Sequence, residues 1–270
     1  MYSRAIQLGN AVLSYDVQGQ GSRALLMFHG AGQDRSIFRQ LPDTITRAYR
    51  VYSFDLFFHG QSVWNSEDAI SKNNWQQLIR SFCETEQVDK MAVFGYSIGA
   101  RFAIAVVELF PKQVTECFLA APDGLVGSPW FSLATGTRLG RNIFSQLMKK
   151  PATLQRLLQL GGRLGAMDPT TLRFVEHQLD NDAKRLRVLK TWTCFRQLRF
   201  DPKELRQIVN SSAIPLTVFL ATSDRMVPEA TVRSFLKRLK SAHLEIIDSN
   251  HRRVLNEALV RISLRSKNNS

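Results

Sequence analysis

The chain has 270 residues, of which 44% are hydrophobic and 22% charged, as in an ordinary globular protein with one large core. Its cysteines, Cys83, Cys117 and Cys194, are an odd set without metal-ligand spacing, so we expect free thiols and no zinc site or disulfide framework. The sequence has no secretory leader pattern and no apolar run of membrane-spanning length, so a cytoplasmic location is the default expectation. The net charge of +13 is the unusual value.

Strand and helix patterns alternate along the first 120 residues. Residues 5–8 and 11–17 are predicted as short strands joined by a Gly-Asn turn, and residues 24–28 form an apolar run typical of a strand buried on both faces of a parallel sheet. Further strands are predicted at 50–54, 91–94 and 114–120, with helices at 36–48, 75–86 and 100–109. This alternation predicts an α/β fold with a mostly parallel sheet flanked by helices.

The pattern changes over residues 123–210, which contain several helical segments and no convincing strand. It resumes with a strand at 214–221, a helix at 229–240, a strand at 243–247 and a last helix after Asn250. We therefore predict a core formed by residues 1–122 and 211–270 and a helical insertion at 123–210. The insertion is too long to be a simple connecting loop.

A G-x-S-x-G segment at residues 95–99 joins a predicted strand to a predicted helix. A serine at the tip of such a turn projects its Oγ away from the sheet, so Ser97 is a candidate nucleophile. Gly95 and Gly99 remove Cβ atoms that would clash where strand and helix close together. The amide of Ile98, at the helix N-terminus, is left free to donate to an anion. Taken alone, the segment also fits an ordinary Gly/Ser turn.

Two further motifs lie upstream, and together the three resemble those of the α/β-hydrolase family. They are His29-Gly30-Ala31-Gly32 and the spaced segment Asp55-x-x-x-His59-Gly60-x-Ser62. The resemblance covers essentially the whole chain, and it places the insertion where that family carries its helical cap or lid. It also implies an oxyanion hole formed by the backbone amides of Ala31 and Ile98. We expect Asp55 and His59 to hold the neighbouring loop by hydrogen bonds rather than to act in catalysis.

A serine nucleophile needs a general base and an orienting carboxylate, which in this family follow the serine along the chain. His251 comes directly after the last predicted strand, at the edge where α/β sheets place their ligands, and is the strongest candidate for the base. The other four histidines are expected to have structural or surface roles: His29, His59, His177 and His243.

For the acid, Asp224 lies in a segment at 221–228 that resembles the family pattern G-x-x-D-x-x-V-P. Ala221 replaces the usual glycine of that pattern, and we expect the replacement to be tolerated if φ is negative there. Asp248 and Asp123 are the rival acids. Asp248 is better explained as a residue that caps its own loop, so Asp224 ranks first.

A serine nucleophile predicts acyl transfer through an acyl-enzyme, and the favoured reaction is hydrolysis of a carboxylic ester or thioester. Amide and C–C bond hydrolysis by the same catalytic triad remain alternatives. So does a protein of this fold that binds a small ligand without catalysis. No phosphate-binding loop or metal-ligand pattern is present, so no cofactor or metal is expected.

The positive charge is concentrated in the insertion. Residues 128–210 contain 15 Lys and Arg against six Asp and Glu, so this segment contributes +9 of the +13. Part of it has the pattern of a basic amphipathic helix, which would favour an anionic or lipid-like acyl substrate or peripheral contact with an anionic membrane. A solvated face whose leucines pack on the core is the alternative, and the favoured one. No groove motif or helix-turn-helix spacing indicates nucleic acid.

Overall fold

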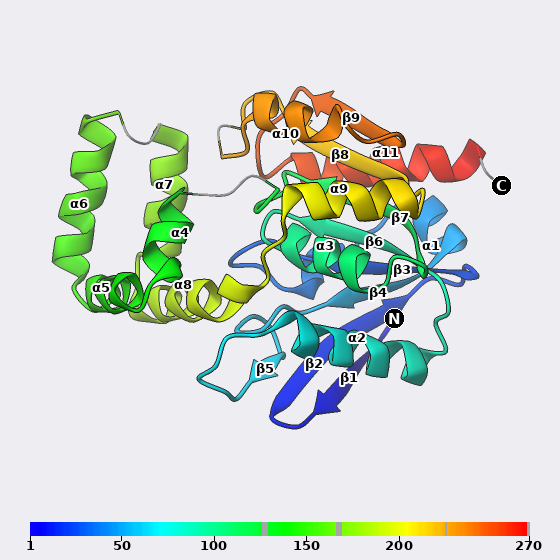
Figure 1. The fold of residues 1–270 in the computed structure, drawn as a ribbon, viewed down its shortest axis with the longest axis horizontal. Helices are drawn as coiled ribbons and strands as arrows, with labels where there is room; N and C mark the ends of the chain where they lie inside the picture. The colour runs from blue at the N-terminus through cyan, green and yellow to red at the C-terminus, as the bar shows by residue number, and fades with distance from the viewer. Residues whose placement is uncertain (126–128, 166–168, 225, 269–270) are drawn as a thin grey trace. The chain divides into compact units, whose positions relative to one another are not determined.

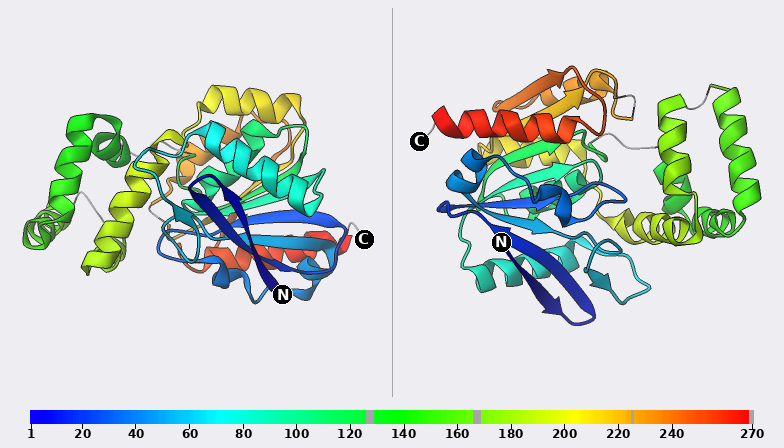
Figure 2. Two further views of the ribbon diagram at one scale, coloured as in Figure 1. Left: turned by 90° about the horizontal axis from the view of Figure 1, so that it is seen from below. Right: turned by 180° about the vertical axis from the view of Figure 1, so that it is seen from behind.

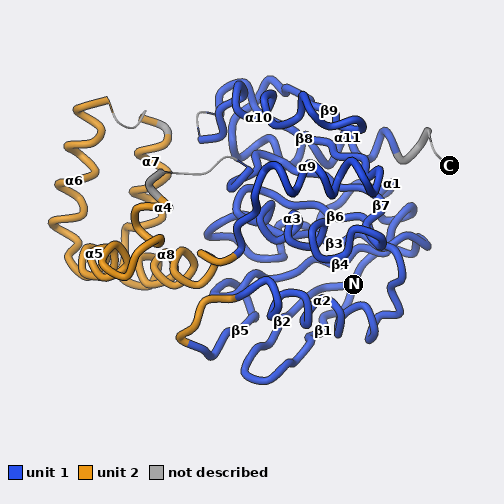
Figure 3. The backbone as a smooth tube through the Cα atoms, in the orientation of Figure 1, with its two compact units in different colours: residues 1–66, 71–126, 198–270 blue, residues 67–70, 127–197 orange. Residues whose placement is uncertain are grey.

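The computed structural model describes residues 1–125, 129–165, 169–224 and 226–268 (Figure 1). Parts of the predicted insertion and Arg225 of the predicted acid segment therefore lie outside the described residues. The chain divides into two compact units, shown in Figure 3. Unit 1 comprises Met1–Ser66, Ser71–Val126 and Leu198–Ser270, and unit 2 comprises Glu67–Ile70 and Gly127–Gln197.

Unit 1 is built on a sheet in which the structure describes nine strands. Their order is β1-β2-β4-β3-β6-β7-β8-β9, and β5 pairs with β2. The strands around β2 are antiparallel, and all pairs from β4 through β9 are parallel. This is the predicted α/β architecture. The strand bounds are β1 Tyr2–Leu8, β2 Ala11–Gln18, β3 Arg23–Phe28, β4 Tyr49–Phe54, β5 Val63–Trp64, β6 Met91–Tyr96, β7 Val114–Ala120, β8 Leu216–Ala221 and β9 Ala242–Ile247.

The strand order reverses beside β3, because the chain passes from β3 to β4 on one side and later returns to β6 on the other. In open α/β sheets, such a reversal leaves a crevice at the carboxyl ends of the two strands that flank it. The segments that begin at His29 and at Ser97 follow β3 and β6, so both lie at this position. The sheet topology thus brings two of the predicted motifs together.

Helices α2, α3 and α9 cover one face of the sheet, and α1 and α11 cover the other (Figures 1 and 2). Ser71 begins α2 with a capping box, in which its hydroxyl accepts from the Asn74 amide and the Asn74 side chain accepts from the Ser71 amide. The helix bounds are α1 Asp43–Ala48, α2 Lys72–Glu86, α3 Gly99–Leu109, α9 Pro202–Ser211, α10 Glu229–Leu236 and α11 Val254–Asn268.

The single helix predicted over 36–48 is wrong. The structure has a short 3-10 helix, η1 (Arg35–Phe38), and then α1. Pro42 precedes α1 and interrupts the pattern, because a proline disfavours helical backbone at the residue before it.

Unit 2 consists of helices with their own small core. Phe144, Met148 and Leu154 form its buried centre, and the Trp192 ring stacks on Phe144 with ring centroids 5.3 Å apart. Ile70 ties the short segment 67–70 to this unit by donating its amide to the Cys194 carbonyl at 3.0 Å. The helices are α4 Pro129–Gly136, α5 Arg138–Met148, α6 Pro151–Arg163, α7 Pro169–Gln178, α8 Asp182–Cys194 and the 3-10 helix η2 Phe195–Gln197.

The long segment of unit 2 ends at Gln197, whereas the predicted insertion runs to residue 210. The difference is α9, which belongs to unit 1 and packs against α3. Leu205 and Val209, one helical turn apart, form its buried face. No described helix in either unit is long and apolar enough to cross a membrane.

Candidate active site

Ser97 occupies a strained turn between β6 and α3. Its φ is 52°, in the left-handed region that non-glycine residues rarely adopt. A Cβ at Gly95 would lie 2.6 Å from the Ala100 Cα, and one at Gly99 would lie 2.2 Å from the Phe28 carbonyl oxygen. No side chain fits at either position, so both glycines of the G-x-S-x-G segment are required by close backbone packing.

The structure brings together the three side chains predicted as nucleophile, base and acid. Asp224 follows β8 and His251 follows β9, and these strands are parallel neighbours. His251 Nδ1 lies 2.7 Å from Asp224 Oδ2, and His251 Nε2 lies 3.2 Å from Ser97 Oγ. With the proton on Nδ1 donated to the carboxylate, Nε2 is left to accept the proton of the serine hydroxyl.

Asp224 is held at both carboxylate oxygens. Oδ2 faces His251, and Oδ1 accepts the amide of Met226 at 2.9 Å. The side chain is 1% exposed and that of His251 is 15% exposed, so their contact is shielded from water. A shielded carboxylate fixes the orientation of the imidazole more strongly than an exposed one would.

Tyr96, the residue before the serine, is a site residue that was not predicted from the sequence. Its hydroxyl donates to the backbone carbonyl of His251 at 2.8 Å, and its ring centroid lies 5.6 Å from that of the imidazole. Burial, together with the nearby negative charge of Asp224, raises the pKa of Tyr96 above its ordinary value, so the hydroxyl stays a donor. The only sequence signal for a role of Tyr96 is its position inside the G-x-S-x-G segment.

The candidate oxyanion donors follow neighbouring strands. Ile98 is the N-cap residue of α3, and Ala31 lies in the turn after β3, which pairs with β6 through Phe28 and Gly95. Within the described residues, neither amide donates a hydrogen bond to a protein acceptor. The turn is fixed beside them, because the Gly30 amide donates to Gln33 Oε1 at 3.1 Å.

Two buried histidines connect this turn to the loop after β4. His29 Nε2 accepts the Leu56 amide at 2.9 Å, and its Nδ1 lies 2.8 Å from the Gly30 carbonyl. His59 Nε2 accepts the Gly32 amide at 3.1 Å, and its Nδ1 lies 3.0 Å from the Phe57 carbonyl. Both rings fit the neutral tautomer with the proton on Nδ1, which suits a structural role and not that of a general base.

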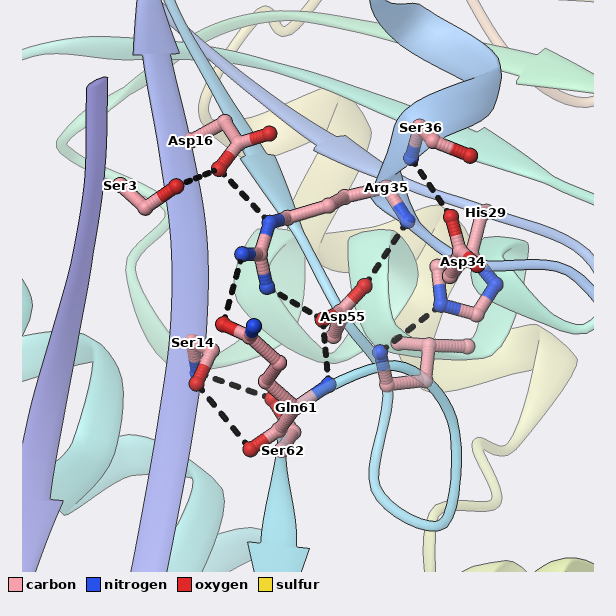
Figure 4. A network of polar contacts seen from close by, with 11 residues as sticks. Ser3, Ser14, Asp16, His29, Asp34, Arg35, Ser36, Asp55, Gln61 and Ser62 are labelled. Carbon is pink, nitrogen blue, oxygen red and sulfur yellow. Dashed lines mark hydrogen bonds and ion pairs between the residues drawn. The ribbon is translucent and has the colours of Figure 1, made fainter.

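The loop after β4 is also held by a buried ionic network (Figure 4). The guanidinium of Arg35 contacts both Asp16, at 2.7 Å, and Asp55. Asp55 in addition accepts the amides of Arg35 and Gln61 at 2.8 and 2.7 Å. The expected structural roles of Asp55 and His59 are therefore confirmed, whereas nothing in the sequence pattern indicated Arg35.

The two rival acids, Asp123 and Asp248, and the histidines His177 and His243 have other partners or positions. Arg101 of α3 binds both carboxylate oxygens of Asp123 at 3.1 and 3.2 Å, and Asp248 accepts the Thr222 hydroxyl at 3.2 Å. His177 lies in α7 with Asp180 at 3.9 Å, and His243 is an exposed residue of β9. In the described part of the chain, none of these four side chains forms a hydrogen bond with the Ser97 hydroxyl.

The cysteines are free and buried, as expected. Burial raises the pKa of both Cys83 and Cys194 to about 11, and it also raises that of Cys117, so none is poised as a thiolate nucleophile. Among the residues that the structure describes, no group of three or more His, Cys, Asp and Glu side chains could hold a metal ion.

A serine on a strand-to-helix elbow, at the carboxyl edge of a mostly parallel sheet and within reach of a histidine, defines the class of α/β hydrolases. The family described as alpha/beta hydrolase fold matches residues 23–257. The chain therefore belongs to the alpha/beta hydrolase fold family, as its motifs indicate.

Two relatives and one solved structure illustrate the family. The chain is 22% identical over 255 residues to 2-hydroxy-6-oxononadienedioate/2-hydroxy-6-oxononatrienedioate hydrolase of Paraburkholderia xenovorans, a match that covers 88% of this chain and 83% of the relative. It is 31% identical over 132 residues to pimeloyl-acyl-carrier-protein methyl ester esterase of Photobacterium profundum, where the match spans less than half of either protein, 47% and 45%.

The solved structure is 2-hydroxy-6-oxo-6-phenylhexa-2,4-dienoate hydrolase of a Rhodococcus species. It superposes with a TM-score of 0.68 at 18% identity and covers 99% of this chain and 98% of that chain. At this identity the likeness establishes the shared fold alone.

Proposed function

We propose that the protein is a serine hydrolase that cleaves an acyl compound, a carboxylic ester or a thioester, through an acyl-enzyme. The observation that carries this proposal is the continuous contact from Ser97 Oγ to His251 to Asp224. A serine hydroxyl is a weak nucleophile at neutral pH, and this arrangement is the one that activates it.

In the proposed reaction, His251 Nε2 takes the hydroxyl proton as Ser97 Oγ bonds to the substrate carbonyl carbon. The carbonyl oxygen becomes an alkoxide, which the amides of Ala31 and Ile98 stabilise. The tetrahedral intermediate then expels an alcohol or thiol, which takes the proton from His251. Water, deprotonated by the same imidazole, hydrolyses the acyl-enzyme and regenerates the serine. Asp224 stabilises the imidazolium in both half-reactions.

Ester hydrolysis is supported by the relative of Photobacterium profundum, whose name states that it acts on a methyl ester. We also propose that unit 2 serves as the cap of the enzyme, because its long segment follows β7, the place in the chain where this family carries its cap.

C–C bond hydrolysis is the second candidate. The relative of Paraburkholderia xenovorans matches over most of its length, and its named substrate is a hydroxy-oxo-dienedioate. Such a compound has neither ester nor amide linkage, so its hydrolysis must break a carbon–carbon bond. The same serine, histidine and aspartate would attack the ketone carbon.

Labelling with a fluorophosphonate probe tests the nucleophile. We expect the wild-type protein and a Ser234→Ala control, altered at an exposed serine of α10, to be labelled, and Ser97→Ala to be unlabelled. We also expect His251→Ala to lower kcat by several powers of ten, as much as about 10⁶-fold, and His177→Ala to leave it unchanged.

Folded protein without Ser97-dependent labelling would favour a binding protein that lacks catalysis. A substrate panel then ranks the two reactions. Faster turnover of p-nitrophenyl esters or acyl thioesters than of a 2-hydroxy-6-oxo-dienoate supports ester hydrolysis, and the reverse ranking supports C–C hydrolysis.

A further inference from the structure

The first half of unit 2 has positive charge without compensating negative charge. Between Asp123 and Asp168 the sequence contains no Asp or Glu, and it contains six cations. Where the structure describes them, none of the six forms an ion pair with a carboxylate. They are Arg138, Arg141, Lys149, Lys150, Arg156 and Arg163.

Two carboxylates of unit 2 are paired outside α5 and α6. Asp180, shortly after α7, binds the Lys184 ammonium at 2.8 Å, and Asp182 binds the Arg185 guanidinium. Both cations belong to α8. The six cations of α5, of α6 and of the link between them therefore carry a positive charge that an external anion can neutralise.

These two helices also expose large apolar side chains. Leu139 and Ile143 of α5, one turn apart, are 70% and 60% exposed. Leu157 and Leu160 of α6 are 49% and 51% exposed, and Leu164 directly after it is 75% exposed. Their spacings of three, four and seven residues place them in one stripe on each helix.

The exposed stripes extend beyond the buried part of each helix. The core of unit 2 takes Phe144 and Met148 from α5 and Leu154 from α6, all of which are buried. A surface helix ordinarily buries most of the apolar stripe it carries. Here the apolar side of each helix is wider than its buried part, and the five side chains named above remain exposed.

Cations and exposed leucines are also adjacent in the sequence. Arg-Leu pairs occur at 138–139, 156–157 and 163–164. An arginine beside an apolar side chain at a lipid boundary can lay its methylene stem along the acyl region while its guanidinium binds a phosphate. Solvation alone does not require exposed leucine side chains on this surface.

We propose that α5 and α6 bind an anionic lipid surface. The five exposed apolar residues enter the boundary between headgroups and acyl chains, and the six cations bind the lipid phosphates. The charge of the surface selects the lipid, because its cations have no carboxylate partner within the described part of the unit. None of these residues belongs to the candidate active site, so lipid binding is independent of the proposed reaction.

Co-sedimentation with phosphatidylcholine vesicles, prepared with and without phosphatidylglycerol, tests the proposal. We expect binding to the vesicles that contain phosphatidylglycerol, and we expect salt to weaken it. The double variant Arg156→Gln/Arg163→Gln should lower the partition coefficient about 30-fold, since each cation near such a surface contributes about fivefold. Leu160→Gln/Leu164→Gln should lower it about tenfold or more, because glutamine keeps the helix propensity and removes the apolar contact.

The matched control is Lys237→Gln/Arg238→Gln, which removes two exposed cations at the end of α10 in unit 1. It has the same net charge as the arginine variant and should bind as wild type does. Ser97→Ala should also bind unchanged, so failure of the catalytic proposal would not affect the result. Circular dichroism checks that each variant is folded.

Three results would overturn the proposal. If wild-type protein does not bind the anionic vesicles, lipid binding by α5 and α6 is excluded. Equal weakening by the control and arginine variants would assign binding to the overall charge. If sedimentation velocity showed a dimer that the leucine variant dissociates, without vesicle binding, the occupant of the surface would be a second copy of the chain.

Discussion

At the scale of single residues, the elbow depends on the absence of two methyl groups. Ser97 keeps its left-handed φ only because the backbones of β3, β6 and α3 approach closely around it. Gly99 is the tightest of these contacts, since its Cα faces the carbonyl oxygens of both Phe28 and His29. Carbonyls of a central strand cannot move aside as a flexible side chain would.

Replacing this glycine is therefore expected to be costly. Gly99→Ala should lower the free energy of unfolding by about 1–3 kcal/mol, because the new Cβ lies 2.2 Å from a backbone oxygen. Urea denaturation measures the change. Gly136→Ala is the control, because a Cβ there meets nothing within 4 Å, and that variant should be neutral or slightly stabilised. Equal stability of the two variants would show that the close approach is absent.

Tyr96 is a residue that positions the base. Its hydroxyl holds the carbonyl of His251, so Tyr96→Phe should let the imidazole move while its contact with Asp224 persists. We expect kcat to fall by up to about tenfold, which corresponds to one hydrogen bond of about 0.5–1.5 kcal/mol, and KM to stay unchanged.

The control for Tyr96 is Tyr15→Phe. Tyr15 is also buried and donates to Glu86 at 2.9 Å, away from the candidate site. That variant should lose stability and keep kcat. If both variants lowered kcat alike, the effect of Tyr96 would be one of general stability and not of positioning.

At the scale of elements, the strands and the site residues that follow them could be predicted, because both depend on local sequence pattern. The buried parallel strands are continuous apolar runs, and the candidate nucleophile, acid and base each follow such a run. Their meeting could be expected because the carboxyl ends of parallel strands share one edge of the sheet.

Features that depend on tertiary contact could not be predicted in this way. Arg35 begins η1, the short 3-10 helix after β3, where an arginine ordinarily faces solvent, and only the fold places it between two buried carboxylates. The exclusion of α9 from unit 2 likewise depends on which neighbour its Leu205 and Val209 contact, which periodicity does not reveal.

The network around Arg35 joins η1 to β2 and to the loop after β4, so its loss should affect several elements together. Arg35→Met should lower the free energy of unfolding by about 3–5 kcal/mol, because it leaves Asp16 and Asp55 buried without a cation. Thermal and urea denaturation measure this loss. Arg47→Met is the control. Its side chain is 81% exposed and lies 3.8 Å from Asp43, so a change of about 0.5 kcal/mol or less is expected.

If the two arginine variants lost similar stability, the buried network would contribute no more than a surface ion pair. Loss of Ser97 labelling in Arg35→Met protein that remains folded would indicate in addition that the network fixes the site. The route for such an effect runs through the loop after β4, where His59 accepts the amide of Gly32.

At the scale of the whole molecule, the net charge of +13 attracts anions however the two units are arranged. If the substrate carries a carboxylate or phosphate, this field raises its concentration near the protein. We therefore expect kcat/KM at low salt to be about tenfold higher for an anionic ester than for a neutral ester of equal chain length. The preference should shrink as salt is added, because at about 1 M salt charges are screened beyond about 3 Å.

The neutral ester serves as the internal control, since any effect of salt on the protein itself changes both substrates alike. A preference for the anionic ester that salt leaves intact would indicate a specific charged contact in the site and not the overall field. Equal kcat/KM for the two esters at low salt would show that the charge of unit 2 does not select the substrate. Its unpaired cations on α5 and α6 would then be explained by the lipid surface alone, and the vesicle experiment tests that explanation independently.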